Sequence, residues 1–210
     1  RIGRYFIHGF HFKSRPPAGL VAIKLDAGGA FGSGEHPTTA ACLQTLDRLS
    51  KHRKIRRPLD MGCGSGILSL AMAKTWKVPV IACDIDAEAV RVTTQNARQN
   101  GVGRLVRAET GPSYRTPRVM AGGPYDLICA NILARPLIAM APALARSLRP
   151  NGIAVLSGLL VAQQRAVINA HRRCGLRLLE YENREGWVTL TLARSAPRRA
   201  RVYRARLGRC

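Results

Sequence analysis

Hydrophobic and polar positions along the chain follow two periods in turn, and this alternation predicts strands and helices that succeed one another. Short apolar runs, typical of buried strands, lie at 57–61, 78–83, 104–109 and 125–130. Helical spacing covers 67–76 and 87–100, and Gly101 has the place of a left-handed C-cap. Because strand and helix alternate, we expect a parallel sheet with helices on both faces.

The second half of the chain continues this pattern and then changes it. We expect a loop at 111–124 and then a helix at 133–148. A strand at 153–157, a helix at 162–174 and two strands at 176–182 and 187–193 should follow. Pro136 and Pro142 should interrupt the first of these helices. No crossover helix separates the last two strands, so they should pair antiparallel. We therefore predict a doubly wound, mostly parallel seven-stranded sheet that ends in an antiparallel hairpin.

The composition indicates a single core. A chain of 210 residues with 46% hydrophobic content can bury one good core. No apolar run has the length of a membrane span, and the start of the chain has neither a signal peptide nor an initiator Met. We expect a cytoplasmic fragment that lacks its true N-terminus. The six cysteines include no C-x-x-C pair, which favours reduced thiols and no metal site.

The formal charge of +22 predicts attraction to polyanions, nucleic acid above all. The segment from Arg48 to Arg57 holds six basic residues in ten, and the end of the chain from Ala193 holds seven arginines. Each basic segment is either a contact surface for nucleic acid or a solvated face, and the sequence leaves both interpretations open.

A glycine-rich segment follows the first predicted strand of the parallel sheet. Gly62, Gly64 and Gly66 lie at every second position in the strand-to-helix loop, where open parallel sheets bind ligands. Ile67 occupies the place of the third glycine of a dinucleotide fingerprint, which argues against a pyrophosphate. Asp60 precedes the loop, and this compact pattern suits a nucleoside with an amino-acid tail, such as S-adenosylmethionine. The alternative is a tight turn that packs a helix on the sheet.

Polar side chains end two further strands. Asp84 lies twenty-two residues past Gly62, where a carboxylate can accept hydrogen bonds from both ribose hydroxyls of a nucleoside. Asp86 is more simply the N-cap of the next helix. Asn131 ends the fourth strand, where its amide oxygen could face a target nitrogen, although an Asn at a strand end can also be only a helix cap.

An unusual segment lies upstream of the glycine loop. Four glycines at 28, 29, 32 and 34 precede a helix that we expect to begin at Pro37. Thr38, Thr39 and the free N–H groups at the helix start could hold a carboxylate. His36 is either a ligand-facing side chain or a cap.

The chain resembles a known family in its ordered motifs. The segments AFGSGEHPTT, LDMGCGSGIL, ACDIDAEAV, ANILARPL, LSGLL and EGWVTLTL are similar to those of the bacterial ribosomal protein L-eleven methyltransferases. The resemblance implies a class I S-adenosylmethionine-dependent fold and methylation of the terminal amine and lysines of a ribosomal protein. It also implies cofactor contacts at Thr39, Gly62, Asp84 and Asn131, with Gly64 and Gly66 in the same loop, and a role for Asn131 in positioning the amine.

Two departures from the family pattern concern the ends of the chain. Family members carry an N-terminal recognition domain before this segment, and the Arg-rich end is not part of their pattern. We expect a linker and Gly-rich segment at 1–56, a methyltransferase domain at 57–193 and a basic, disordered tail at 194–210. The alternative functions are an amino-group methyltransferase of RNA or DNA, although no aromatic platform follows Asn131, and an inactive nucleic-acid-binding module of the same fold.

Overall fold

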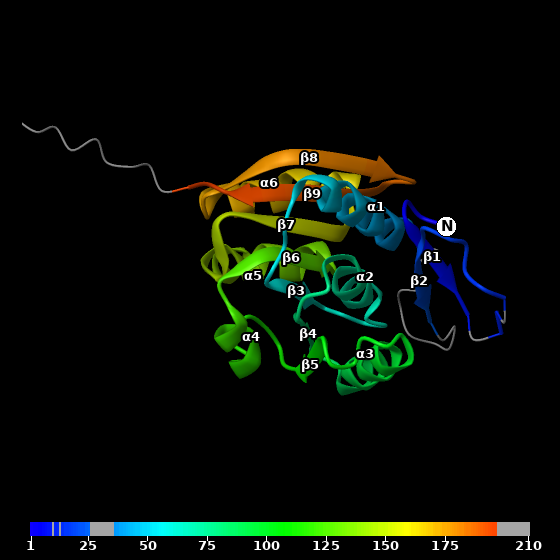
Figure 1. Cartoon of the computed structure of the whole chain (residues 1–210). Helices are drawn as coiled ribbons and strands as arrows, with labels where there is room; N and C mark the ends of the chain where they lie inside the picture. The colour runs from blue at the N-terminus through cyan, green and yellow to red at the C-terminus, as the bar shows by residue number, and fades with distance from the viewer. Residues whose placement is uncertain (10, 13, 26–35, 197–210) are drawn as a thin grey trace, which may run out of the picture.

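A seven-stranded sheet forms the centre of the computed structural model, which describes residues 1–9, 11–12, 14–25 and 36–196 (Figure 1). The strand order is β5-β4-β3-β6-β7-β9-β8. The strands are β3 (Pro58–Met61), β4 (Val80–Asp84), β5 (Val106–Thr110), β6 (Tyr125–Asn131), β7 (Leu148–Leu160), β8 (Leu176–Arg184) and β9 (Trp187–Arg194). Strands β3 to β7 pair parallel, whereas β9 pairs antiparallel with β7 and β8. The predicted mostly parallel sheet with an antiparallel terminal hairpin is confirmed.

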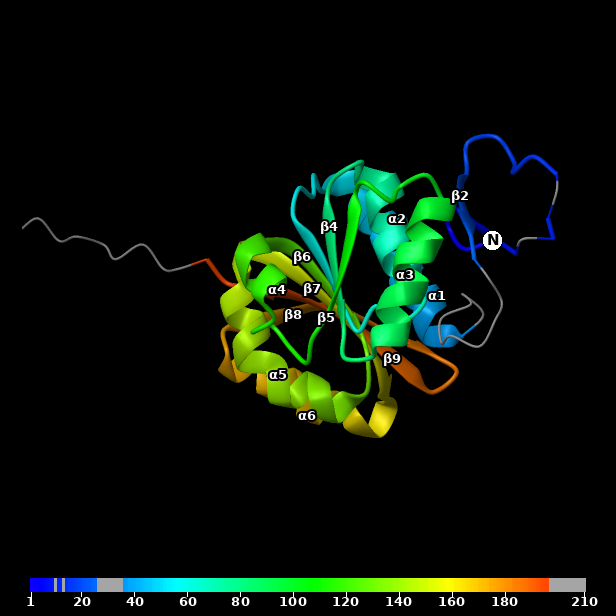
Figure 2. The ribbon, with the colours of Figure 1, turned by 90° about the horizontal axis from the view of Figure 1, so that it is seen from below.

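Six helices cover the two faces of this sheet among the described residues (Figure 2). The helices on one face are α1 (Pro37–His52), α2 (Ile67–Trp76) and α3 (Ala87–Gln99). Those on the other are α4 (Pro117–Gly122), α5 (Ala134–Ser147) and α6 (Gln164–Arg173), the last preceded by the 3-10 turn Val161–Gln163. Two hydrophobic clusters separate the helices from the sheet, one on each face. Buried Leu43 of α1 belongs to the first cluster and buried Leu137 of α5 to the second.

Two predictions about the second half of the chain are wrong. Helix α4 lies inside the segment that we expected to be a loop, and its six residues are too few to show a helical period. Helix α5 runs through both prolines. Pro136 is in the first turn, where its missing N–H has no partner in any case, and Pro142 is exposed, so that water can reach the carbonyl it leaves free.

The sequence did not predict a small parallel sheet near the N-terminus. Strands β1 (Tyr5–His8) and β2 (Val21–Lys24) pair with each other, and β2 lies against α2. The buried Tyr5 hydroxyl is 2.9 Å from Thr75 Oγ1, and the Asn100 side chain donates to Lys24 O at 2.6 Å. These contacts fix the start of the chain on the first helical layer; the division at residue 57 stays a prediction.

The described cysteines form no disulfide with one another. Cys42, Cys63, Cys83 and Cys129 are buried, and Cys174 is partly buried. Across the described ranges, no helix is both long enough and apolar enough to cross a membrane.

Candidate functional site

The glycine loop lies at the carboxyl end of β3, beside the end of β4. Gly62, Gly64 and Gly66 all have left-handed backbone, with φ of 75°, 52° and 80°. The Gly62 N–H donates to Cys83 O at 2.7 Å, which ties the loop to the neighbouring strand. Gly66 opens α2 and has no side chain to cap it, and the N-terminal end of the helix dipole favours negative charge nearby.

Asp84 joins the glycine loop to the end of β4. Its Oδ2 accepts the Gly64 N–H at 2.9 Å, and its Oδ1 accepts the Asp86 N–H at 3.1 Å. The side chain is only partly buried, and each carboxylate oxygen keeps a further lone pair for a ligand hydroxyl. Asp86 accepts the Glu88 N–H at 2.9 Å and is the N-cap of α3, as predicted.

Asp60 lies beneath the loop and is 1% exposed. Its Oδ2 accepts the Ser69 N–H at 2.9 Å and the Ser69 hydroxyl at 2.6 Å. Burial raises the pKa of Asp60 to about 7, the Ser69 hydrogen bonds oppose this rise, and the Asp84 charge adds to it. Asp60 therefore holds the first turn of α2 in place, and near neutral pH both of its protonation states are populated.

Asn131 and Thr39 meet at the edge of the same site. The Asn131 Nδ2 donates to Thr39 Oγ1 at 3.3 Å, although the residues are 92 positions apart. The Asn131 Oδ1 is buried and accepts no hydrogen bond from any described residue. An unsatisfied buried acceptor costs about 1–3 kcal/mol, so a ligand that brings an N–H or O–H to this atom gains from the contact.

The loop after β6 packs against bare backbone on two sides. A Cβ on Gly62 would lie 2.2 Å from Ile132 Cγ2, and a Cβ on Gly158 would lie 2.4 Å from Ile132 O. The Ile132 N–H donates to Ser157 O at 3.1 Å. Only glycine at both positions lets this loop approach the sheet so closely, and this approach places Asn131 beside the glycine loop.

His36 is the N-cap of α1. Its Nδ1 accepts the Thr38 N–H at 3.4 Å and lies 2.8 Å from Thr38 Oγ1, while its ring packs edge-on against Trp187 at 5.0 Å between centroids. Of the two interpretations of His36, the structure supports the cap. The rest of the Gly-rich segment, including the glycines at 28, 29, 32 and 34, lies outside the described residues.

Two exposed aliphatic side chains at this edge were not predicted. Ile85 is 74% exposed directly after Asp84, and Leu133 is 69% exposed two positions after Asn131. Each offers apolar surface next to a polar group, where a base or an aliphatic stem can be covered. The available signal was an apolar residue directly after a polar strand end, outside any helical or strand period.

The sheet order, the glycine loop and the acid at the end of β4 define the class of Rossmann-like, S-adenosylmethionine-dependent methyltransferases. More narrowly, the chain belongs to the ribosomal protein L11 methyltransferase (PrmA) family, whose model matches residues 1–195. The resemblance drawn from the motifs is confirmed.

Curated relatives and solved structures agree with this assignment. The L11 methyltransferase of Rhizobium etli (strain CIAT 652) is 46% identical over 190 residues, which are 90% of this chain and 65% of that protein. The chain therefore spans about two thirds of the length of the curated relatives. The L11 methylase of Lactobacillus delbrueckii subsp. bulgaricus superposes with a TM-score of 0.82 at 27% identity, over 92% of this chain and 96% of that one. The O-methyltransferase TomG of Streptomyces achromogenes, solved with SAM, shares only the fold, with a TM-score of 0.59, 16% identity and coverage of 75% and 81%.

Proposed function

We propose that this chain transfers methyl groups from S-adenosylmethionine to amino groups of ribosomal protein L11, namely its N-terminal amine and its lysines. Membership of the family supports the substrate. The observation that carries the chemistry is the buried, unsatisfied Oδ1 of Asn131 beside the glycine loop, because it is an acceptor that lacks a donor among the described residues. An amine nitrogen supplies such a donor.

The residues at the edge fit the cofactor. Gly62, Gly64 and Gly66 give the loop the left-handed turns that shape it around the ligand, and Asp84 keeps free lone pairs for the ribose. Thr39 and Asn131 close the site from the side of α1 and β6. When bound, the cofactor supplies an electrophilic methyl carbon on a sulfonium.

Asn131 positions the acceptor in this proposal. Its Nδ2 donates to Thr39 Oγ1, which leaves its Oδ1 on the other side of the amide to accept an N–H of the incoming amine. This contact orients the nitrogen lone pair, and orientation supplies most of the rate in an in-line displacement.

The acceptor amine must be neutral to react, although a free lysine has a pKa of about 10.4. No described carboxylate or imidazole bonds to Asn131 or Thr39, and Asp60 is buried under the loop with its Oδ2 bound to Ser69. Desolvation beside a positive sulfonium favours the neutral amine, and Leu133 supplies apolar surface at this point.

Transfer of label from the cofactor tests the proposal. The chain is incubated with methyl-labelled S-adenosylmethionine and either purified L11 or ribosomal RNA, and an Asn131→Ala variant serves as the control. We expect label on L11 in the wild-type reaction and a loss of most of it in the variant. Label on RNA alone would assign the chain to nucleic-acid methylation, and cofactor binding without any transfer would make it an inactive module.

A further inference from the structure

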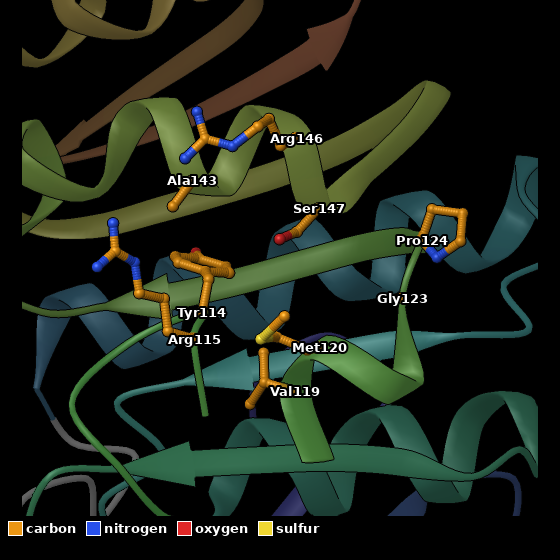
Figure 3. A pocket seen from close by; sticks show the side chains of 9 residues that line it. All are labelled: Tyr114, Arg115, Val119, Met120, Gly123, Pro124, Ala143, Arg146 and Ser147. Carbon is orange, nitrogen blue, oxygen red and sulfur yellow. The ribbon is translucent and has the colours of Figure 1, made fainter. Parts of the chain in front are cut away.

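A groove between α4 and α5 lies outside the proposed cofactor site (Figure 3). Its volume is about 500 Å³, which lies within the usual range for pockets that hold small ligands. The floor is formed by buried Tyr114 and Val119, and the walls include Met120 of α4 and Arg146 of α5. The groove shares no residue with the glycine loop, Asp84 or Asn131.

Two arginines give the groove its charge. Arg115 and Arg146 are exposed, come from opposite walls, and place their guanidinium groups at the same end of the groove, near Tyr114 (Figure 3). Nearby arginines are neutralised: Arg118 pairs with Glu109 at 2.5 Å, and Arg149 pairs with Asp126 at 2.8 Å. In the described part of the chain no carboxylate pairs with Arg115 or Arg146, and no acid lines the groove. Two unneutralised guanidinium groups on facing walls are suited to one phosphate.

The same groove has apolar surface that a phosphate alone does not use. Met120 is 66% exposed, although it stands in a basic environment, and Pro124 continues this wall. Burial raises the pKa of Tyr114 well above its ordinary value, so its phenol stays protonated. A ligand for this groove therefore combines an anion at the arginine end with a flat apolar body against Met120.

We propose that the groove binds an unpaired nucleotide of single-stranded RNA, with its phosphate between Arg115 and Arg146 and its base against Met120 and the floor at Tyr114. Unstacked bases are bound in this way, on apolar or guanidinium surfaces beside a phosphate contact. An acidic peptide would satisfy the arginines but leave Met120 exposed. The formal charge of +22 adds long-range attraction to RNA. The inference goes beyond methyl transfer and does not depend on it.

Anisotropy of a short labelled oligouridylate, measured over a series of salt concentrations, tests the site. Arg146→Gln should weaken binding about tenfold and lower the slope of log Kd against log salt by about 0.7, the value for one contact to single-stranded nucleic acid. Arg104→Gln is the matched control, because it removes the same charge from an exposed turn that does not line the groove. It should change Kd less than about twofold. Met120→Ala should weaken binding about threefold without changing the slope, since it removes only apolar contact.

Several outcomes would overturn the proposal. Equal losses in Arg146→Gln and Arg104→Gln would show diffuse attraction to a basic surface, and an unchanged Kd in Met120→Ala would remove the base from the groove. Competition by uridine monophosphate as strong as by the oligomer, at equal nucleotide concentration, would indicate a mononucleotide site instead. Polyglutamate that competes equally well would indicate an acidic peptide. Cofactor affinity, measured on the same variants, should not change, so failure here leaves the methyltransferase proposal intact.

Discussion

Replacing Asp84 with alanine should weaken cofactor binding without unfolding the protein. The carboxylate accepts two backbone N–H groups, from Gly64 at 2.9 Å and from Asp86 at 3.1 Å, and we propose that its remaining lone pairs accept the ribose hydroxyls. Loss of hydrogen bonds to a charged acceptor costs about 1.5–3 kcal/mol, which corresponds to roughly 10- to 100-fold in Kd. Freeing the Gly64 N–H also loosens the glycine loop, so the upper part of this range is expected.

A matched control separates this effect from charge and from stability. Asp86→Ala removes the same charge two positions away, and Asp86 is an exposed N-cap whose side chain bonds Glu88 N. Loss of such a cap costs about 0.5–2 kcal/mol in the free energy of unfolding. We therefore expect Asp86→Ala to lower the melting temperature while leaving the Kd for the cofactor unchanged.

Calorimetric titration with S-adenosylmethionine and thermal unfolding of the same samples provide the two measurements. A Kd that Asp84→Ala leaves at the wild-type value would remove Asp84 from the site. Equal weakening by both substitutions would show that net charge at this edge matters and that the geometry of Asp84 does not.

The remaining predictions concern the acceptor, the buried acid, the loop contact and the substrate. Asn131→Ala should lower turnover much more than cofactor affinity if, as we propose, its unpaired Oδ1 holds the acceptor amine in the transition state; steady-state kinetics and calorimetry on the same variant measure the two effects. Burial raises the pKa of Asp60 from 3.8 to about 7, so the folded state binds the extra proton and the free energy of unfolding should fall as pH rises through this interval. The fall is at most about 4 kcal/mol, and Asp60→Asn should remove it in urea titrations. Gly158→Ala should destabilise by about 1–3 kcal/mol and reduce turnover, whereas Gly175→Ala, at a similar φ of 83° with no atom within 4 Å, should only destabilise. Joining the third of the Rhizobium etli relative that lies outside the match to this chain should raise the rate of L11 methylation, which a label assay measures, while leaving the cofactor Kd unchanged.

The order of strands and helices could be predicted because hydrophobic periodicity and turn-forming residues are local features of the sequence. Helix α2 has the predicted bounds, and the turn before β9 correctly indicated an antiparallel pair. Helix α4 and the four-residue strands β1 and β2 are too short to display a period, and their structure depends on packing of α4 against β4 and of β2 against α2. In such short segments tertiary contacts, and not local secondary-structure propensity, decide which structure forms.

Part of the candidate site could also be predicted from the sequence, and part of it could not. Asp84 and the glycine loop could be placed together, because parallel strands that are neighbours in a sheet end at one edge. The hydrogen bond between Thr39 and Asn131 could not, because it depends on how α1 lies across the sheet, 92 positions away in the chain. Family resemblance named both residues as contacts but did not predict that each holds the other.

For binding an anion, the positions of the arginines that have no acidic partner matter more than the total charge of the chain. The segment from Arg48 to Arg57 contains six basic residues, but Arg48 itself pairs with Glu180 at 3.4 Å and with Glu182 at 3.5 Å. Part of that segment therefore serves to dock α1 on the terminal hairpin. Composition alone cannot separate such arginines from Arg146, because the difference lies in which acids the fold brings near each one.

Ile132 links the two halves of the proposed site. It lies against Gly62, in the proposed cofactor loop, and against Gly158, in β7, while its neighbour Asn131 carries the proposed acceptor contact. The distance between cofactor and acceptor is therefore set by contact of backbone and an aliphatic side chain, and close-packed contacts of this kind deform little. Alanine at Asp84 or Asn131 would remove hydrogen bonds but would leave this packing contact in place. A single added methyl group at Gly62 or Gly158 would instead displace one half of the site from the other, because it would meet Ile132 at 2.2 Å or 2.4 Å.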